Sequence, residues 1–241
     1  MIHVRLLVTR PEPEGARTAA LLRARGHEVR LVPLLRIEPV ADAVFGAGPW
    51  AGVVFTSTNA VRAIAAHRRL SELAGLPAYA VGARTREAAV AAGFAGTVSA
   101  EGDVDDLARL IAAKVGAAGL PLLHFARHDR AGDLAAALRK AGRPVETVIA
   151  YRAAMVGDFD ADVRSAIAGG GIDGVLHYSA RTAGAFIAAA AAAGVTDYAM
   201  KIRHFCLSAQ VAAPLVAAGA ATVDIAAAPN EAALLALIDM P

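Results

Sequence analysis

The chain has 241 residues, a length that permits one large α/β domain or two small ones. Its hydrophobic content of 56% is rich in alanine, and the longest uncharged run, Thr182 to Thr196, is too short to span a bilayer. A net charge of +2 with both signs scattered argues against a nucleic-acid surface. The single cysteine, Cys206, and the lack of a secretory signal fit a reducing cytoplasm. We therefore expect a cytoplasmic protein without membrane or nucleic-acid partners, and a monomer by default.

Strand patterns alternate with helix patterns along almost the whole chain. Strands are expected at 4–8, 28–40, from 52, and at 77–82, 96–99, 120–126, 144–153, from 174, 203–208 and 222–226. Helices are expected at 14–25, from the junction after 55 to about 73, at 85–92, 103–113 and 133–141, before 169, after 179, at 211–218 and from 230. This alternation predicts parallel sheets with helices on both faces.

Two strand-to-helix junctions carry a cluster of hydroxyl and amide side chains. One is Val53-Val54-Phe55-Thr56-Ser57-Thr58-Asn59, and the other is Val175-Leu176-His177-Tyr178-Ser179-Ala180-Arg181-Thr182. A helix N-terminus has unpaired N–H groups and a partial positive charge, so such a junction is able to hold an anion. The alternative is that Ser57 or Thr58 simply caps its helix.

An internal repeat explains why the junction occurs twice. Three segments match in the same order: 6–10 with 123–127, the Ser57 junction with the Ser179 junction, and 79–82 with 205–208. The two long strands, near Ile37 and near Tyr151, fall at equivalent places. If each crosses between domains, we expect domains of 1–36 plus 155–241 and of 41–148, with linker strands 37–40 and 149–154. Ligands of open α/β sheets bind beyond the strand ends, which predicts one cleft between the two domains.

The chemistry-bearing residues favour binding of a polyanion over acid–base or metal chemistry. The histidines lack metal-ligand spacing, and His124 and His177 are expected to be hydrogen-bonded structural residues. Asp103, Asp105 and Asp106 are expected to begin a helix. Hydroxyls, amides and arginines remain at the strand ends, and these suit many modest contacts to carboxylates. Among them Arg10 and Arg127 are equally consistent with surface arginines.

Several segments together resemble uroporphyrinogen-III synthases over essentially the whole chain. They are Thr9-Arg10-Pro11, Phe55 to Val61, Ala80-Val81-Gly82 with Thr85, the Arg127 segment, Tyr151-Arg152 and the Ser179 junction. The resemblance implies two flavodoxin-like domains joined by a two-stranded β-ladder, with the active-site cleft between them. It implies a cofactor-free lyase of tetrapyrrole (haem, sirohaem, cobalamin or chlorophyll) synthesis. The enzyme would convert hydroxymethylbilane to uroporphyrinogen III, inverting ring D through a spiro intermediate.

The resemblance also implies roles for individual residues. Tyr151 would help the substrate hydroxyl to leave, unless it is only a half-buried strand tyrosine. The substrate-binding residues would be Arg10, Thr56, Ser57, Thr58, Asn59, Gly82, Thr85, Arg127, Ser179, Ala180, Arg181, Thr182 and Ser208. The second half departs from the family pattern at His177-Tyr178, at Ser208 to Val211 and at Ala126, which affects the contacts rather than the fold.

Two alternatives remain at this point. One is a two-domain binding or sensor module that closes on a small anionic ligand without reacting it. The other is a small sugar-phosphate transferase, although the chain shows neither a nucleotide-binding glycine pattern nor a carboxylate pair.

Overall fold

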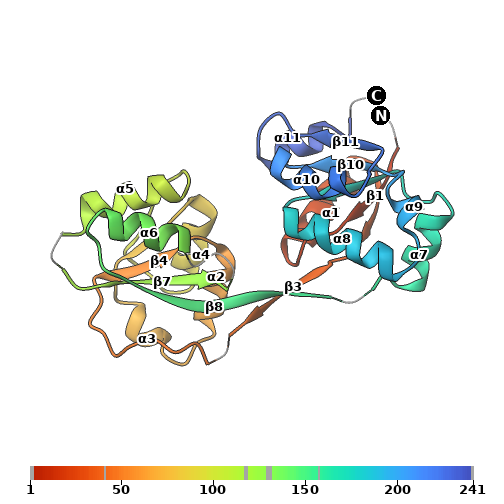
Figure 1. Ribbon diagram of the computed structural model, residues 1–241. Helices are drawn as coiled ribbons and strands as arrows, with labels where there is room; N and C mark the ends of the chain where they lie inside the picture. Colours follow the sequence, from red (N-terminus) through yellow and green to blue (C-terminus); the bar gives the residue numbers. More distant parts are fainter. Residues whose placement is uncertain (1–2, 41, 117–118, 129–131, 157, 240–241) are drawn as a thin grey trace. The chain divides into compact units, whose positions relative to one another are not determined.

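The computed structural model describes residues 3–40, 42–116, 119–128, 132–156 and 158–239. The chain divides into two compact units, Met1–Arg36 with Ala154–Pro241, and Ile37–Ala153. The middle of the sequence therefore forms one unit, while the two ends of the sequence together form the other (Figure 1). No helix among the described residues is long and apolar enough to cross a membrane.

The first unit contains a sheet of order β11-β10-β9-β1-β2. Its strands are β1 (Arg5–Val8), β2 (Glu28–Leu31), β9 (Gly174–His177), β10 (Arg203–Cys206) and β11 (Thr222–Ile225), and each neighbouring pair is parallel. Its helices are α1 (Glu14–Ala24), α7 (Ala161–Ala168), α8 (Ala180–Ala192), α9 (Thr196–Ala199), α10 (Ala209–Ala217) and α11 (Glu231–Ala236). One core cluster packs α7 to α10 on the sheet, and another packs α1 and α11. Helices therefore cover both faces of this sheet.

The second unit contains a sheet of order β3-β8-β7-β4-β5-β6. Its strands are β3 (Leu35–Pro39), β4 (Gly52–Phe55), β5 (Ala78–Ala80), β6 (Thr97–Ser99), β7 (Leu122–Arg127) and β8 (Val145–Met155). The start of β3 and the end of β8 extend into the first unit, because the unit boundaries fall after Arg36 and after Ala153. Its helices are α2 (Thr58–Ala65), α3 (Leu70–Leu73), α4 (Ala83–Ala91), α5 (Val104–Lys114) and α6 (Gly132–Lys140). The pairs from β8 to β6 are parallel. One core cluster includes α2, α3 and α4, and another includes α5 and α6.

The two sheets confirm the internal repeat. If β7, β8, β4, β5 and β6 are matched with β1, β2, β9, β10 and β11, both sheets have the same strand order. That order is the flavodoxin-like 2-1-3-4-5 of a doubly wound sheet. The predicted α/β class with parallel sheets is therefore correct.

Local signals in the sequence account for many helix ends. The Asp103 side chain accepts hydrogen bonds from the N–H groups of Asp105 (2.9 Å) and Asp106 (3.0 Å), and the Asp106 carboxylate accepts one from Asp103 N–H. This is a capping box, so the expectation that these acids begin a helix is confirmed. Gly26 and Gly142 follow α1 and α6 with φ of 87° and 71°, a conformation that favours glycine at a helix C-terminus.

Two expected elements are interrupted in the structure. The long strand expected at 28–40 is two strands, because Pro33 lies at the break and β2 and β3 belong to different sheets. The long helix expected up to residue 73 is divided into α2 and α3. There the Nδ1 atom of His67 accepts a hydrogen bond from the N–H of Arg69 (3.2 Å), which replaces a helical bond. The short helix α9 was not predicted.

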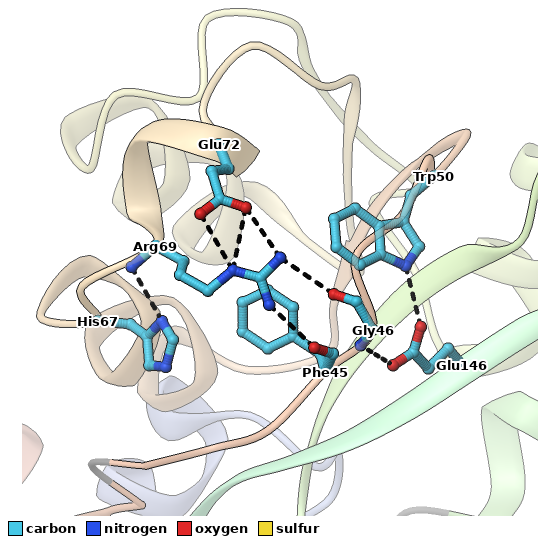
Figure 2. Close-up of polar contacts among 7 residues, drawn as sticks. All are labelled: Phe45, Gly46, Trp50, His67, Arg69, Glu72 and Glu146. Atoms are coloured by element: carbon cyan, nitrogen blue, oxygen red, sulfur yellow. Dashed lines mark hydrogen bonds and ion pairs between the residues drawn. The ribbon is translucent and has the colours of Figure 1, made fainter.

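The segment between β3 and β4 is held against the second unit by a cluster that Figure 2 shows. The Arg69 guanidinium donates to the carbonyl oxygens of Phe45 (2.9 Å) and Gly46 (3.0 Å) and lies 4.3 Å from the centroid of the Phe45 ring. The Glu146 carboxylate on β8 accepts from the N–H of Gly46 (2.8 Å) and from Nε1 of Trp50 (2.9 Å). The cluster thus anchors this segment to the strand that also carries the candidate catalytic tyrosine.

Candidate active site

Each sheet has one point at which the direction of winding reverses. In the second unit this point lies between β7 and β4, and in the first unit between β1 and β9. The helices that follow the two strands cover opposite faces there, which leaves a crevice at the carboxyl ends of the strands. Both Ser57 and Ser179 follow a strand at such a point.

A cavity of about 240 Å³ lies at the switch point of the second unit. It brings together four predicted site residues: Thr56 and Ser57 after β4, Arg127 at the end of β7, and Tyr151 on β8. Arg127 and Tyr151 are register partners across an irregularity of the β7–β8 ladder. The residues that line the cavity are Thr56, Ser57, Val104, His124, Arg127, Leu134 and Tyr151.

The predicted residues around Ser57 belong to the N-terminus of α2. Ser57 is the N-cap, and its Oγ accepts a hydrogen bond from the N–H of Asn59 (3.1 Å). Ser57 therefore does cap α2, as the alternative interpretation expected. Because the hydroxyl hydrogen of a capping serine remains available as a donor, the cap does not prevent a contact to an anion. Thr58 begins the helix, and the Asn59 amide oxygen accepts from Arg62 (3.1 Å).

Two further predicted residues lie at the start of α4. Gly82 is the N-cap and has no side chain to satisfy the first N–H groups of the helix. Thr85 is buried in the first turn of this helix. Neither residue lines the cavity described above, so they offer a separate helix N-terminus at the same edge of the sheet.

In the first unit the predicted residues form the start of α8. The Oγ of Ser179 accepts from the N–H of Thr182 (3.1 Å) and lies 2.6 Å from the Thr182 hydroxyl. Thr182 is buried, Ala180 is half-buried and Arg181 is exposed. Ser208, at the start of α10, makes no capping hydrogen bond with its side chain.

Arg10 lies in an ionic cluster of the first unit. Its Nη1 atom donates to Oε1 of Glu231 (3.0 Å) and to the hydroxyl of Thr18 (3.1 Å), and its guanidinium lies 4.0 Å from the centroid of the Tyr178 ring. Burial alone would raise the pKa of Glu231, but the hydrogen bond from Thr18 and the charges of Arg10 and Arg17 outweigh it and lower that pKa. The cluster fixes Arg10 next to the β1–β9 switch point.

The histidine predictions have opposite outcomes in the two units. Nε2 of His177 lies 3.1 Å from Nδ1 of His204, so His177 is the hydrogen-bonded structural residue that was expected. Burial lowers its pKa well below the ordinary value. For His124 the expected hydrogen bond is not found, because neither ring nitrogen has a hydrogen-bond partner among the described residues, and the side chain lines the cavity. Its only signal in the sequence is a polar residue within the otherwise apolar run from Leu122 to Ala126.

Other kinds of chemistry find no support among the described residues. They contain no group of three His, Cys, Asp or Glu side chains placed to hold a metal ion. Burial raises the pKa of the Cys206 thiol to about 12, which makes it a poor nucleophile. The predicted site residues instead supply hydroxyls, guanidinium groups and helix N-termini, all of which are hydrogen-bond donors.

The fold and these sites define a class of protein: a duplicated flavodoxin-like α/β protein with donor-rich sites at the switch points of both sheets. A family model described as "Uroporphyrinogen-III synthase HemD" matches residues 16–236. The chain therefore belongs to the uroporphyrinogen-III synthase family, whose members are cyclising lyases of tetrapyrrole synthesis.

Solved structures of this family have the same fold. Uroporphyrinogen-III synthetase from Helicobacter pylori 26695 aligns with a TM-score of 0.64 and 15% identity over 98% of each chain. A mutant uroporphyrinogen III synthase from the extremely thermophilic bacterium Thermus thermophilus aligns with a TM-score of 0.54 and 16% identity, covering 98% of this chain and 97% of that one. A sequence search of curated proteins found no match.

Proposed function

We propose that this chain cyclises hydroxymethylbilane to uroporphyrinogen III, and that Tyr151 and the residues at the two switch points carry the reaction. Family membership over residues 16–236 supports the activity. The observation that supports the site is the cavity that Tyr151 lines together with Thr56, Ser57 and Arg127. A tyrosine hydroxyl beside groups that bind carboxylates fits a reaction in which a hydroxyl leaves a substrate with eight carboxylates.

The reaction begins with loss of the hydroxyl from the ring A end of the substrate. Tyr151 donates a proton to this hydroxyl, which departs as water while the pyrrole nitrogen of ring A supplies the electron pair. Ring D then attacks the cationic methylene carbon through its substituted position and forms the spiro intermediate. The original bond between this position of ring D and the methylene carbon of ring C then breaks, and ring C supplies the electron pair that leaves this methylene carbon cationic. The unsubstituted α position of ring D attacks the same methylene carbon and loses its proton, which balances the proton given by Tyr151 and gives the inverted isomer.

Control of geometry is the main task of the protein in this reaction. Without an enzyme the substrate closes with ring D uninverted. The protein must therefore hold the linear tetrapyrrole in the conformation from which ring D attacks through its substituted position. The cavity, at about 240 Å³, is smaller than the roughly 300–1,000 Å³ of sites that enclose a whole drug-sized ligand. It holds one part of the substrate, and the other carboxylates need the remaining helix N-termini and arginines.

The domain organisation enters this proposal as a prediction. Strands at 37–40 and 149–154 would link the domains. The N–H of Val40 donates to the carbonyl oxygen of Ala150 (2.8 Å), a contact that supports pairing of these two segments. We further propose a cytoplasmic monomer that has no nucleic-acid partner and needs no cofactor.

An isomer assay tests the function directly. Enzymatically prepared hydroxymethylbilane is incubated with the protein, and the type I and type III products are resolved after oxidation. We expect an excess of type III over the spontaneous type I. Unchanged type I would end the proposal and leave the non-catalytic binding module. The KM should also rise as salt is added, because the substrate is a polyanion.

A further inference from the structure

His124 is a buried histidine at the floor of the cavity in the second unit. It lies in the middle of β7, and its residue is only 1% exposed. Its neighbours Leu123 and Phe125 belong to the core cluster that includes α2 and α4, whereas Leu122 belongs to the cluster that includes α5 and α6. Since side chains alternate along a strand, His124 lies on the α5 and α6 face with Leu122. His124 and Tyr151 both line the cavity at the switch point of the second unit.

The imidazole of His124 lacks the partners that a buried polar group normally has. Neither Nδ1 nor Nε2 makes a hydrogen bond to a described residue. Burial of an unpaired polar group destabilises a folded protein, so a structural histidine would be expected to have at least one bond. His27 has the same unpaired nitrogens, but of the two only His124 lines the cavity, which gives a partner from outside the described protein a place to bind.

The surroundings of His124 indicate the chemistry of that partner. The cavity wall contributes the hydroxyls of Thr56, Ser57 and Tyr151 and the guanidinium of Arg127, and none of the described residues that line it is acidic. The N-terminus of α2 adds a partial positive charge. A cavity lined by donors fits an anionic group, and a carboxylate is the anion that the proposed substrate carries.

We propose that His124 binds the substrate by donating a hydrogen bond to one of its carboxylate arms in this cavity. The inference depends on the proposed function and adds a substrate-binding residue to it. Burial holds the pKa of His124 at about 4, so its imidazole is neutral at neutral pH and carries one N–H donor. His124 therefore contributes a contact that carries no charge, in contrast to Arg127.

An internal water is the competing explanation. Thr147 on β8 is the register partner of His124, and its Oγ1 is also buried without a partner among the described residues. A water between the two side chains would satisfy both, and His124 would then have only a structural role. Because this explanation requires Thr147 and the substrate explanation does not, matched variants of the two residues distinguish them.

The experiment compares H124F, H124Q and T147V with the wild-type protein. The KM for hydroxymethylbilane, the kcat, the ratio of type III to type I product and the urea midpoint are measured for each. We expect H124F to raise KM about 10–100-fold, as for loss of a hydrogen bond to a charged group, with an unchanged or higher urea midpoint. The factor should be the same at low and high salt, since the donor is neutral. H124Q should recover most of the affinity, and T147V should leave KM unchanged.

Two results would overturn the inference. One is a wild-type KM for H124F, and the other is an equal effect of T147V accompanied by a lower urea midpoint in both variants. If H124F does not fold, H124L takes its place in the comparison. A wild-type protein that yields only type I product would instead refute the proposed function, and this inference with it.

Discussion

The role of Tyr151 is tested by removal of its hydroxyl group alone. Tyr151 is 6% exposed, and its ring packs in the core cluster that includes Phe45 and Phe125. Its hydroxyl makes no hydrogen bond to a described residue. Y151F therefore keeps the packing of the ring, and we expect the free energy of unfolding to change by less than about 1 kcal/mol.

The effect of Y151F on the reaction should be much larger. Loss of a positioned proton donor costs about 10²–10⁴ in rate, which corresponds to about 3–5 kcal/mol of transition-state stabilisation. The assay is steady-state conversion of hydroxymethylbilane to the type III isomer. We expect kcat to fall within this range while KM changes little, because the hydroxyl is used mainly in the transition state.

A second tyrosine of the same unit supplies the matched control. Tyr79 on β5 is 5% exposed, and it is not among the described residues that line the cavity. Burial raises the pKa of Tyr79, as expected for a core tyrosine. Y79F makes the same chemical change at similar burial and should leave kcat unchanged. A near-wild-type kcat for Y151F, or an equal loss in both variants, would show that Tyr151 only packs.

Three further predictions follow from the charges and hydrogen bonds. E231Q removes the negative charge that pairs with Arg10, whose side chain is 17% exposed, and should lower the free energy of unfolding by about 1–3 kcal/mol in urea denaturation; an unchanged midpoint would mean that the pair contributes nothing. Burial lowers the pKa of His204 to about 4, so between pH 6.5 and 4 the unfolded chain binds more protons than the folded one. The share of stability that depends on His204 is therefore fully present above pH 6.5 and should fall by up to about 3 kcal/mol as the pH drops to 4; H204F should remove this share, while the buried His124 and His177 keep theirs. E146A removes the acceptor of the Trp50 indole N–H, and since Trp50 is the single tryptophan, its fluorescence emission should shift as the segment loosens; an emission maximum equal to that of the wild type would contradict the anchoring role.

The α/β class and the repeat could be read from the sequence because their signals are local. The alternation of apolar strands with capped helices depends on residues a few positions apart, as the capping box at Asp103 and the N-cap at Ser57 illustrate. Matched junctions in the two halves were visible for the same reason. The structure confirms both, since the two sheets have one strand order.

Interruptions of regular elements were less visible, because they depend on competition between local and distant contacts. The segment from 28 to 40 is apolar enough for one strand, but β2 pairs with β1 and β3 lies beside β8 in the other sheet. The helix after Ser57 ends early because the His67 side chain takes the N–H of Arg69. The periodicity of apolar residues reveals neither effect.

The sequence by itself determined the strand and helix chemistry, the duplication and the residues that resemble a known family. Only the tertiary structure decided which side chains meet: Arg10 with Glu231, and Tyr151 with Ser57 and Arg127. These partners lie far apart in the chain. Pairing of β4, β7 and β8 brings Tyr151 to Ser57 and Arg127, and packing of α11 on the sheet brings Glu231 to Arg10. The same holds for His124, whose lack of a partner is a property of its surroundings and cannot be read from its place in a strand.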